Sequence, residues 1–397
     1  MLINFEFSNF QSFKDIEKIN LESSAKNEYN PGFFQDSSHH ISKFLMIVGP
    51  NGGGKSNLLR ALSFTTWFMQ SSFGEIKPGQ QIPVSPHFFS SCEPSTFKLT
   101  FIANKTTYEY TLIVTPKRVL FEQLRSKNPK TKKLKNVFKR QFNERLQAYN
   151  WDRDKELMQT FDVADNISTL SVGHYLKNLT STHIAEMLII RTPQFVGFNA
   201  YQANVHLQEM GKFFYEHPDY FDQAKAIICQ LDLGLSDITI DRRTFLGPNQ
   251  QTIEFFVLIG KHEGLGQTQS LEFQFQSLGT QASLWLLRLT LPALKSGGTC
   301  IIDELDNHLH PELVDSFIKL FLTHAHNPQH AQLIFASHQH HLLNQLEKSQ
   351  IQLVEKDDNC VSHTWRLDEM KGIRTDENHA AKYRAGAYGA IPEVELI

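Results

Sequence analysis

Cysteine is scarce in this chain of 397 residues, and no two cysteines have CxxC spacing. The four cysteines are Cys92, Cys229, Cys300 and Cys360. A secreted disulfide scaffold needs many closely spaced cysteines, and a zinc ribbon needs CxxC pairs. Both classes are therefore excluded, and the cysteine content is typical of a protein from a reducing cytoplasm.

Long apolar runs and a strong excess of one charge are also missing. The most apolar stretch, residues 284–294, is interrupted by Arg288, whereas a membrane span needs roughly 18 or more apolar residues in sequence. The opening MLINFEF lacks the basic and apolar regions of a signal peptide. The net charge of −3 gives no global basic bias, so a nucleic-acid site would have to be a local patch. We therefore expect a cytoplasmic protein without membrane contact of its own.

Short apolar and alternating segments at both ends of the chain predict strands. Leu2 to Phe7 alternates between apolar and polar residues, and Phe44 to Val48 is a continuous apolar run that favours a strand buried on both faces. A helical pattern follows over residues 57–69. Segments 97–102 and 108–114 alternate and predict a hairpin, with residues 119–124 continuing the same sheet. Further strands are expected at 238–240, 252–259, 300–302 and 333–336.

The middle of the chain differs in character. A dense basic stretch runs from Lys127 to Arg140, and residues 161–231 are mostly helical in pattern, with amphipathic segments at 183–190 and 221–231. Strands alternating with helices in the last 130 residues or so indicate an α/β core. We therefore predict a head made of residues 1–124 and 246–397, and a basic hairpin plus mainly helical insertion at 125–245.

The strongest motif follows the apolar run that ends at Val48. It fits the pattern G-x-x-x-x-G-K-[ST] at each fixed position and consists of Gly49, Pro50, Asn51, Gly52, Gly53, Gly54, Lys55 and Ser56. Glycines let backbone N–H groups approach a phosphate, and the following helix adds its positive end. Lys55 can neutralise phosphate oxygens, Ser56 can bind Mg²⁺, and Asn57 completes the expected nucleotide-binding set. A chance match in a glycine-rich turn would lack the buried strand before the loop and the helix after it.

An acidic pair, Asp303 and Glu304, ends the apolar segment Cys300 to Ile302. An Asp at a strand end can hold Mg²⁺, and an adjacent Glu can orient or deprotonate an attacking water. The alternative is two solvated acids in a turn. Because a phosphate loop precedes them in the chain, we predict Asp303 as a metal ligand together with Ser56, and Glu304 as the catalytic base.

Taken in order, these motifs resemble those of ABC-type ATPases, in the branch near SMC and RecF-like proteins. The segment from Ser277 to Gln281 (SLGTQ) is similar to the signature motif, residues 305–311 to the D-loop, and Phe335 to His338 to the switch-histidine strand. The resemblance implies ATP contacts from Ser277, Gly279 and Asp306 and a catalytic role for His338. It also implies an α/β P-loop NTPase fold of ABC-ATPase type, with a mixed sheet and an N-terminal antiparallel β part. Leu278 departs from the small or polar residue that the family has there.

A narrower resemblance is to stand-alone bacterial ATPases of phage-defence systems, of the abortive-infection, Septu and PARIS kinds. It rests on the opening Asn9 to Phe13 (NFQSF) and on the ending, residues 374–378 with 383–392. Gln11 stands where that branch has arginine. Such ATPases act with a second protein, often a nuclease, and this chain has no acidic nuclease cluster of its own outside the ATPase motifs.

The family resemblance also implies the mechanism. ATP and Mg²⁺ are held between two heads, one supplying residues 49–56 with the acidic pair and the other supplying the signature. Since the chain carries one copy of each motif, we expect a homodimer or a higher oligomer, with an effector from a neighbouring gene as the second partner.

Two alternatives remain open at this stage. The lysine-rich stretch 127–140 either binds a nucleic-acid backbone or forms the solvated rim of a hairpin. Histidines gather at 308–310, 324–330 and 338–341 and could bind zinc, but the first and last groups fall in expected ATPase motifs.

At the level of function, the main hypothesis is an ATPase switch of a defence complex. The alternative is a DNA-maintenance ATPase of the RecF or SMC kind that binds DNA directly. The insertion is too short for long coiled-coil arms and shows no sustained heptads, which favours the first. A transporter subunit is disfavoured by the form of the signature and by the ending.

Overall fold

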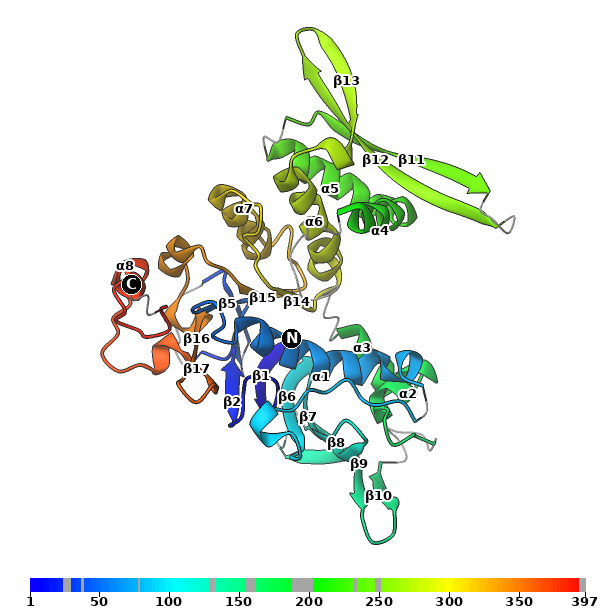
Figure 1. Ribbon diagram of the computed structural model, residues 1–397, viewed down its shortest axis with the longest axis vertical. Helices are drawn as coiled ribbons and strands as arrows, with labels where there is room; N and C mark the ends of the chain where they lie inside the picture. Colours follow the sequence, from blue (N-terminus) through cyan, green and yellow to red (C-terminus); the bar gives the residue numbers. More distant parts are fainter. Residues whose placement is uncertain are drawn as a thin grey trace.

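The computed structural model describes residues 1–23, 30–36, 39–77, 79–128, 131, 133–154, 162–187, 203–231, 234–246 and 251–392. It is a mixed α/β structure with an antiparallel N-terminal sheet and a mixed sheet, and a slender arm projects from one end (Figure 1).

The central five-stranded sheet has the order β14-β15-β5-β16-β17, parallel except for β17. Its strands are β5 (Phe44–Val48), β14 (Thr299–Ile302), β15 (Gln332–Ala336), β16 (Ile351–Lys356) and β17 (Ser362–Arg366). The predicted burial of β5 on both faces is confirmed, since all five of its residues are buried. Alternate side chains of β5 enter two different apolar cores, one on each side of the sheet.

A seven-stranded antiparallel sheet forms the other large layer, in the order β10-β9-β8-β7-β6-β1-β2. Its strands are β1 (Leu2–Ser8), β2 (Glu17–Asn20), β6 (Ser95–Ala103), β7 (Thr106–Val114), β8 (Val119–Lys127), β9 (Leu134–Asn143) and β10 (Ala148–Arg153). The predicted hairpin is present as β6 and β7, and both of its turn residues, Asn104 and Lys105, have positive φ. Such a turn matches the twist of the strands that it joins.

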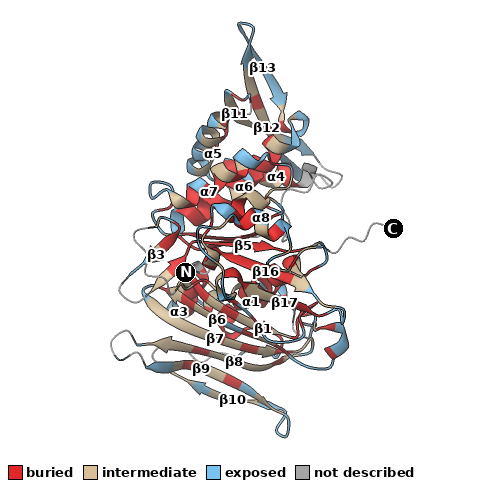
Figure 2. Cartoon of the chain, turned by 90° about the vertical axis from the view of Figure 1, so that its left-hand side faces the viewer, coloured by how far each residue is buried: buried red, intermediate tan, exposed pale blue. Residues whose placement is uncertain are grey.

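Helix α1 (Lys55–Glu75) lies between these two sheets (Figure 2). Its buried residues Leu58, Leu62 and Phe64 belong to the same core as Phe5 and Phe97 of the antiparallel sheet. The helix is therefore covered on both sides, which fixes the direction in which its N-terminus points.

Helices share the core on the other side of the central sheet with Phe44, Met46 and Val48 of β5. These are α4 (Ala203–Glu216), α5 (Pro218–Gln230), α6 (Leu278–Ser296), α7 (Pro311–Leu322) and α8 (His379–Arg384). Two short helices, α2 (Thr169–Tyr175) and α3 (Leu179–Met187), pack near the far end of α1 instead. Short 3₁₀ turns also occur, among them η3 (Phe273–Phe275) and η4 (His340–Asn344).

Two smaller sheets complete the structure. β3 (Phe33–Gln35) pairs with β4 (His40–Ser42). The arm consists of β11 (Asp237–Leu246), β12 (Thr252–Gly264) and β13 (Gln267–Glu272), and it lies at the opposite end of the molecule from β10 (Figure 1).

The segment 125–245, expected to be a basic hairpin plus a mainly helical insertion, holds both strands and helices. Residues 134–153 form β9 and β10, which extend the antiparallel sheet, while the expected helices are present as α2 to α5. Part of the expected amphipathic segment 183–190 lies outside the described residues. The lysines concealed the strand pattern of β9, where Phe138 and Arg140 face the interior and Lys139 between them does not.

A buried polar cluster joins this part of the sheet to α2. Arg140 and Glu122, both fully buried, form an ion pair with Nε and Oε2 2.8 Å apart. The Glu122 carboxylate also accepts hydrogen bonds from the Tyr110 hydroxyl at 2.8 Å, the Ser168 hydroxyl at 2.7 Å and the Thr169 hydroxyl at 2.7 Å. Arg140 is therefore a structural residue and is removed from the set that could touch nucleic acid.

We expect Arg140→Met to lower the free energy of unfolding by about 3–5 kcal/mol, because Glu122 would be left buried and without its counter-charge. Urea denaturation measures this loss. The control is Arg125→Met in the same sheet, since Arg125 pairs with Glu109 at 2.7 Å in a partly exposed position. That change should cost less than about 1 kcal/mol, and equal losses in the two variants would contradict the assignment.

Candidate functional site

The phosphate loop, residues 49–54, connects β5 to α1 at the carboxyl end of the central parallel strands. Three of its glycines are required by space or by backbone conformation. A Cβ on Gly49 would lie 2.0 Å from the carbonyl oxygen of Val354 in β16. Gly52 and Gly54 have φ of 76° and 120°, and a Cβ on Gly54 would lie 2.6 Å from the Ser362 hydroxyl. The loop can therefore keep this path only with glycine at these positions.

A pair of serines from the two ends of the chain holds the loop from behind. The Ser362 hydroxyl lies 2.8 Å from the carbonyl oxygen of Gly53 and 2.8 Å from the Ser12 hydroxyl. Ser12 in turn accepts a hydrogen bond from the Asn57 side chain at 2.8 Å. The serine of the NFQSF segment thus fixes the phosphate loop and the first turn of α1. Sequence reasoning did not assign this role, because a lone serine in β17 carries no signal.

Lys55 begins α1 and folds back over the loop. Its ammonium donates hydrogen bonds to the carbonyl oxygens of Gly49 at 2.9 Å and Pro50 at 3.1 Å. Burial lowers the pKa of Lys55, and nearby carboxylates oppose that shift. These carboxylates belong to Asp303, Glu304 and Asp306. The structure therefore brings the predicted phosphate loop and the predicted acidic residues into one electrostatic neighbourhood.

Ser56 and Asp303 lie next to each other. Asp303 is buried at the end of β14, and burial raises the pKa of its carboxyl group. A hydrogen bond from Ser56 and the positive charges of Lys55 and Arg60 act in the opposite direction. One hydroxyl and one carboxylate are hard oxygen donors of the kind that Mg²⁺ prefers, so the residues present fit the predicted metal.

Glu304 has a different environment from its neighbour. Its side chain is exposed, and its backbone has a φ of 52°, in the left-handed region that non-glycine residues rarely adopt. The carbonyl of Glu304 accepts a hydrogen bond from the Asn307 N–H at 2.9 Å, which holds the turn. Strained backbone of this kind gathers at functional sites, and here it aims a carboxylate away from the core beside Asp303.

The residues after Glu304 are tied to the strand that carries the predicted switch histidine. The Leu305 N–H donates to the carbonyl of Ala336 at 3.0 Å, and the His338 N–H donates to the Asp306 carboxylate at 3.2 Å. His338 itself is exposed. Glu304, Asp306 and His338 therefore form one connected group at the sheet edge.

The predicted signature residues lie at the start of α6. Ser277 is the N-cap, and its hydroxyl accepts a hydrogen bond from the Thr280 N–H at 3.1 Å. A Cβ on Gly279 would lie 3.0 Å from the carbonyl oxygen of His308. The signature thus contacts the D-loop of its own chain, while no hydrogen bond joins Ser277 to residues 49–57 in the described chain. The structure does not bring Ser277 and the phosphate loop together within one copy.

The C-terminal segment around α8 packs against the turn that follows the predicted switch histidine. Asn378 caps α8, and the Asn344 side chain at the end of η4 accepts a hydrogen bond from the Ala380 N–H at 3.0 Å. The ring of Tyr383 packs edge-on against His340, with centroids 4.8 Å apart. Residues 379–390 therefore brace the turn that follows His338.

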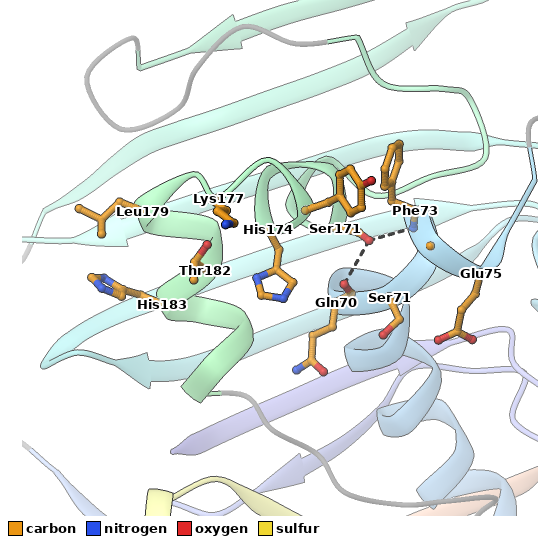
Figure 3. Close-up of a pocket in the computed structure, with 12 residues that line it drawn as sticks. Gln70, Ser71, Phe73, Glu75, Ser171, His174, Lys177, Leu179, Thr182 and His183 are labelled. Carbon is orange, nitrogen blue, oxygen red and sulfur yellow. Dashed lines mark hydrogen bonds between the residues drawn. The ribbon is translucent and has the colours of Figure 1, made fainter.

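A cavity of about 750 Å³ lies at the opposite end of α1 from the phosphate loop (Figure 3). Gln70 and Ser71 of α1 face His174 and Thr182 of α2 and α3 across it. At a rise of about 1.5 Å per residue, some 15 residues of helix separate Lys55 from Gln70 by roughly 22 Å. This cavity is therefore separate from the candidate nucleotide site.

The structure gives little support to the other sites considered, the histidine-based zinc site and the basic stretch. The described residues contain no group of three or more His, Cys, Asp or Glu side chains placed to hold a metal ion. In the basic stretch, Lys130 and Lys132 lie outside the described residues, Lys135 pairs with Asp154 at 2.5 Å, and Arg140 is buried. Among the helices that the structure describes, none is long and apolar enough to span a bilayer.

Comparison with known proteins gives one family. A family model described as "AAA domain, putative AbiEii toxin, Type IV TA system" matches residues 44–344. Among solved structures, the chain is similar to the Smc head domain with an extended coiled coil bound to the C-terminal domain of ScpA, from Pyrococcus furiosus. The identity is 12% over 93% of this chain and 97% of that chain, with a TM-score of 0.42. No curated protein matches.

We expect Ser362→Ala to weaken ATP binding by roughly 5- to 100-fold, because the Gly53 carbonyl and Ser12 would lose a buried partner worth about 1–3 kcal/mol. Titration with a fluorescent ATP analogue measures the change. The matched control is Thr364→Val in the same strand, whose hydroxyl bonds to Leu353 rather than to the loop. If both variants bind ATP as the unaltered chain does, the serine pair does not hold the loop in its binding form.

Proposed function

We propose that this chain is an ATPase that closes as a dimer around ATP and controls a separate effector protein. The chain belongs to the family described as "AAA domain, putative AbiEii toxin, Type IV TA system". The observation that carries this proposal is the division of the site. The phosphate loop, Ser56 and the acidic pair lie close together. Gly279, by contrast, lies against His308 of the predicted D-loop, and Ser277 has no hydrogen bond to the phosphate loop in the described chain. Two copies related by a two-fold axis can each supply what the other lacks.

In the first half-site, the chain's own residues bind and orient the triphosphate. The backbone N–H groups of the loop and the N-terminus of α1 face the β-phosphate, and Lys55 leaves the carbonyls of Gly49 and Pro50 to neutralise phosphate oxygens. Ser56 and Asp303 would hold Mg²⁺, which supplies positive charge to the phosphate oxygens as they become more negative.

Hydrolysis then needs a group that handles the proton of water. A water oxygen attacks the γ-phosphorus, the bond between that phosphorus and the β,γ-bridging oxygen breaks, and ADP leaves with the electron pair. Glu304, exposed and held in a strained turn, orients this water and accepts its proton. Asp306, two residues after Glu304, holds the backbone N–H of His338, and His338 would contact the γ-phosphate.

The second copy supplies its signature. Ser277 is the N-cap of α6. The positive N-terminal end of that helix and the Ser277 hydroxyl would therefore face the γ-phosphate bound by the first copy. A γ-phosphate held by both copies joins them, and its release separates them. Nucleotide state therefore shifts the population between closed and open dimers.

The output of the switch is a second protein. The chain has no metal-binding cluster of a nuclease within its described residues, and the family description includes a toxin–antitoxin system. Both support an effector encoded by a neighbouring gene, for which a nuclease in antiphage defence is our proposal from the sequence resemblance. The DNA-maintenance alternative is weaker, because Arg140 is buried and Lys135 is paired in the stretch that would touch DNA.

We expect Glu304→Gln to slow ATP hydrolysis by about 10²- to 10⁴-fold while leaving ATP binding intact, since it removes a general base but keeps the shape of the side chain. In ATP and Mg²⁺ this variant should stay closed, and closure should protect the backbone amides of residues 277–281 from hydrogen–deuterium exchange, because they would lie against the nucleotide of the second copy. Removal of Mg²⁺ with EDTA should reverse the change.

The control adds Ser277→Arg to Glu304→Gln, which blocks the signature without touching the phosphate loop. This double variant should bind ATP and fail to close. Protection of residues 277–281 in the double variant, or a Glu304→Gln chain that binds ATP without gaining this protection, would contradict the sandwich. Expression of Glu304→Gln with its flanking genes tests the output: a co-purifying protein supports the switch, and nucleic acid alone supports DNA maintenance.

A further inference from the structure

Strand β12 is apolar on both of its faces. Residues 253–259 read Ile-Glu-Phe-Phe-Val-Leu-Ile, with a single charged residue. Successive side chains of a strand point to opposite faces, so a strand with one solvated face should alternate between apolar and polar residues. The composition of β12 is therefore that of a strand covered on both sides.

One face of β12 is covered within the chain. Phe256 and Leu258 are 6% and 3% exposed, and the ring of Phe256 lies 5.0 Å from that of Tyr215 in α4. A Cβ on Gly211 of α4 would lie 2.4 Å from the carbonyl oxygen of Phe256, so helix and strand are in close contact. This face of the arm belongs to the main core.

The other face is open to solvent. The register places Phe245 beside Ile253, Arg243 beside Phe255 and Asp241 beside Val257. Phe245, Ile253 and Phe255 are 55%, 42% and 38% exposed, and the rings of Phe245 and Phe255 contact each other edge-on at 5.5 Å. We call Phe245, Ile253, Phe255 and Val257 the arm face; it lies on the side of β12 opposite to Phe256, which contacts α4.

The edge of the arm is also incomplete. Among the described strands, β11 pairs only with β12, and β13 pairs with β12 only from Ile259 to Gly264. The part of β12 before Ile259 therefore has a strand on one side alone. Open edges and apolar faces in one hairpin are features that proteins cover with another element or with a partner.

We propose that the arm face docks against the same face of a second copy of this chain and holds the two copies together without nucleotide. The charges around the arm face support a second copy as the occupant. Arg243 lies 2.8 Å from Asp241 and 3.2 Å from Glu272, so both signs flank the apolar residues. A patch carrying both signs is complementary to itself when it meets its own image across a two-fold axis.

The position of the arm along the chain supports the same occupant. β13 ends at Glu272, η3 follows, and the signature serine comes five residues after Glu272. Two apolar residues near Ser277, Phe275 and Leu278, are 67% and 41% exposed. The choice of a second copy rests on the proposed function, because that function places the signature against another copy of the chain. The arm contact is an addition to that function, because it would hold the two copies together in every nucleotide state. Each half-site would then stay at high effective concentration near the other while ATP binding and hydrolysis close and open the dimer.

The test is the native mass of the full chain without nucleotide, in EDTA, at one fixed concentration. The unaltered chain should be a dimer, and the double variant Phe245→Ser with Phe255→Ser should be a monomer. The control is Leu146→Ser in the turn between β9 and β10, a leucine that is 68% exposed, and it should stay dimeric. Unchanged thermal unfolding and unchanged ATP binding of the double variant show that the head is intact.

Two results would overturn the arm contact: a double variant that remains dimeric, or an unaltered chain that is monomeric without nucleotide. If the double variant remains dimeric and also loses a co-expressed protein, the arm binds that protein instead. Failure of the sandwich is distinguished by Glu304→Gln in ATP. If ATP protects residues 277–281 of that variant while the nucleotide-free chain is monomeric, the sandwich stands and the arm contact falls. A nucleotide-free dimer that binds ATP without protection of residues 277–281 gives the reverse.

Discussion

Strand β5 is covered on both faces, and the geometry of the candidate site follows from that constraint. Its alternate side chains enter two cores, so helices must lie on one side of the central sheet and α1 with the antiparallel sheet on the other. Its neighbours β15 and β16 run parallel to it, and their carboxyl ends therefore meet at the edge where the phosphate loop begins. The close approach of Gly49 to Val354, and the place of His338 just after β15, are consequences of this packing.

In the proposed dimer, the predicted D-loop, residues 305–311, would connect the two kinds of half-site. Asp306 accepts a hydrogen bond from the N–H of His338, the predicted switch histidine, and the carbonyl of His308 lies against Gly279 of the predicted signature. In the proposed dimer, a shift of the turn at Glu304 would thus reach the signature that serves the other nucleotide. Strain at Glu304, with its φ of 52°, is consistent with a turn that changes between two states.

The arm and the buried Glu122–Arg140 pair are two places where local composition disagrees with local structure. In β9 a chain rich in lysine forms a strand with a charged residue inside, and that charge is satisfied by a carboxylate and by carbonyl groups. In β12 an apolar strand leaves one face uncovered. The first conflict is resolved within the chain; in our proposal, the second is resolved by a second copy of the chain.

Local sequence determined what depends on local chemistry. The phosphate loop, the burial of β5, the hairpin of β6 and β7 and the acidic end of β14 each follow from residue type and short-range spacing, because turns and strand faces are encoded within a few residues. The tertiary structure alone decided which distant groups meet. Ser12 and Ser362 are 350 residues apart in sequence and in contact behind the loop, while the signature is held at its own D-loop. The sequence pattern indicates which face of a strand or helix is buried, but it does not indicate which residue from a distant part of the chain packs against that face. That contact depends on how the elements pack in the folded chain.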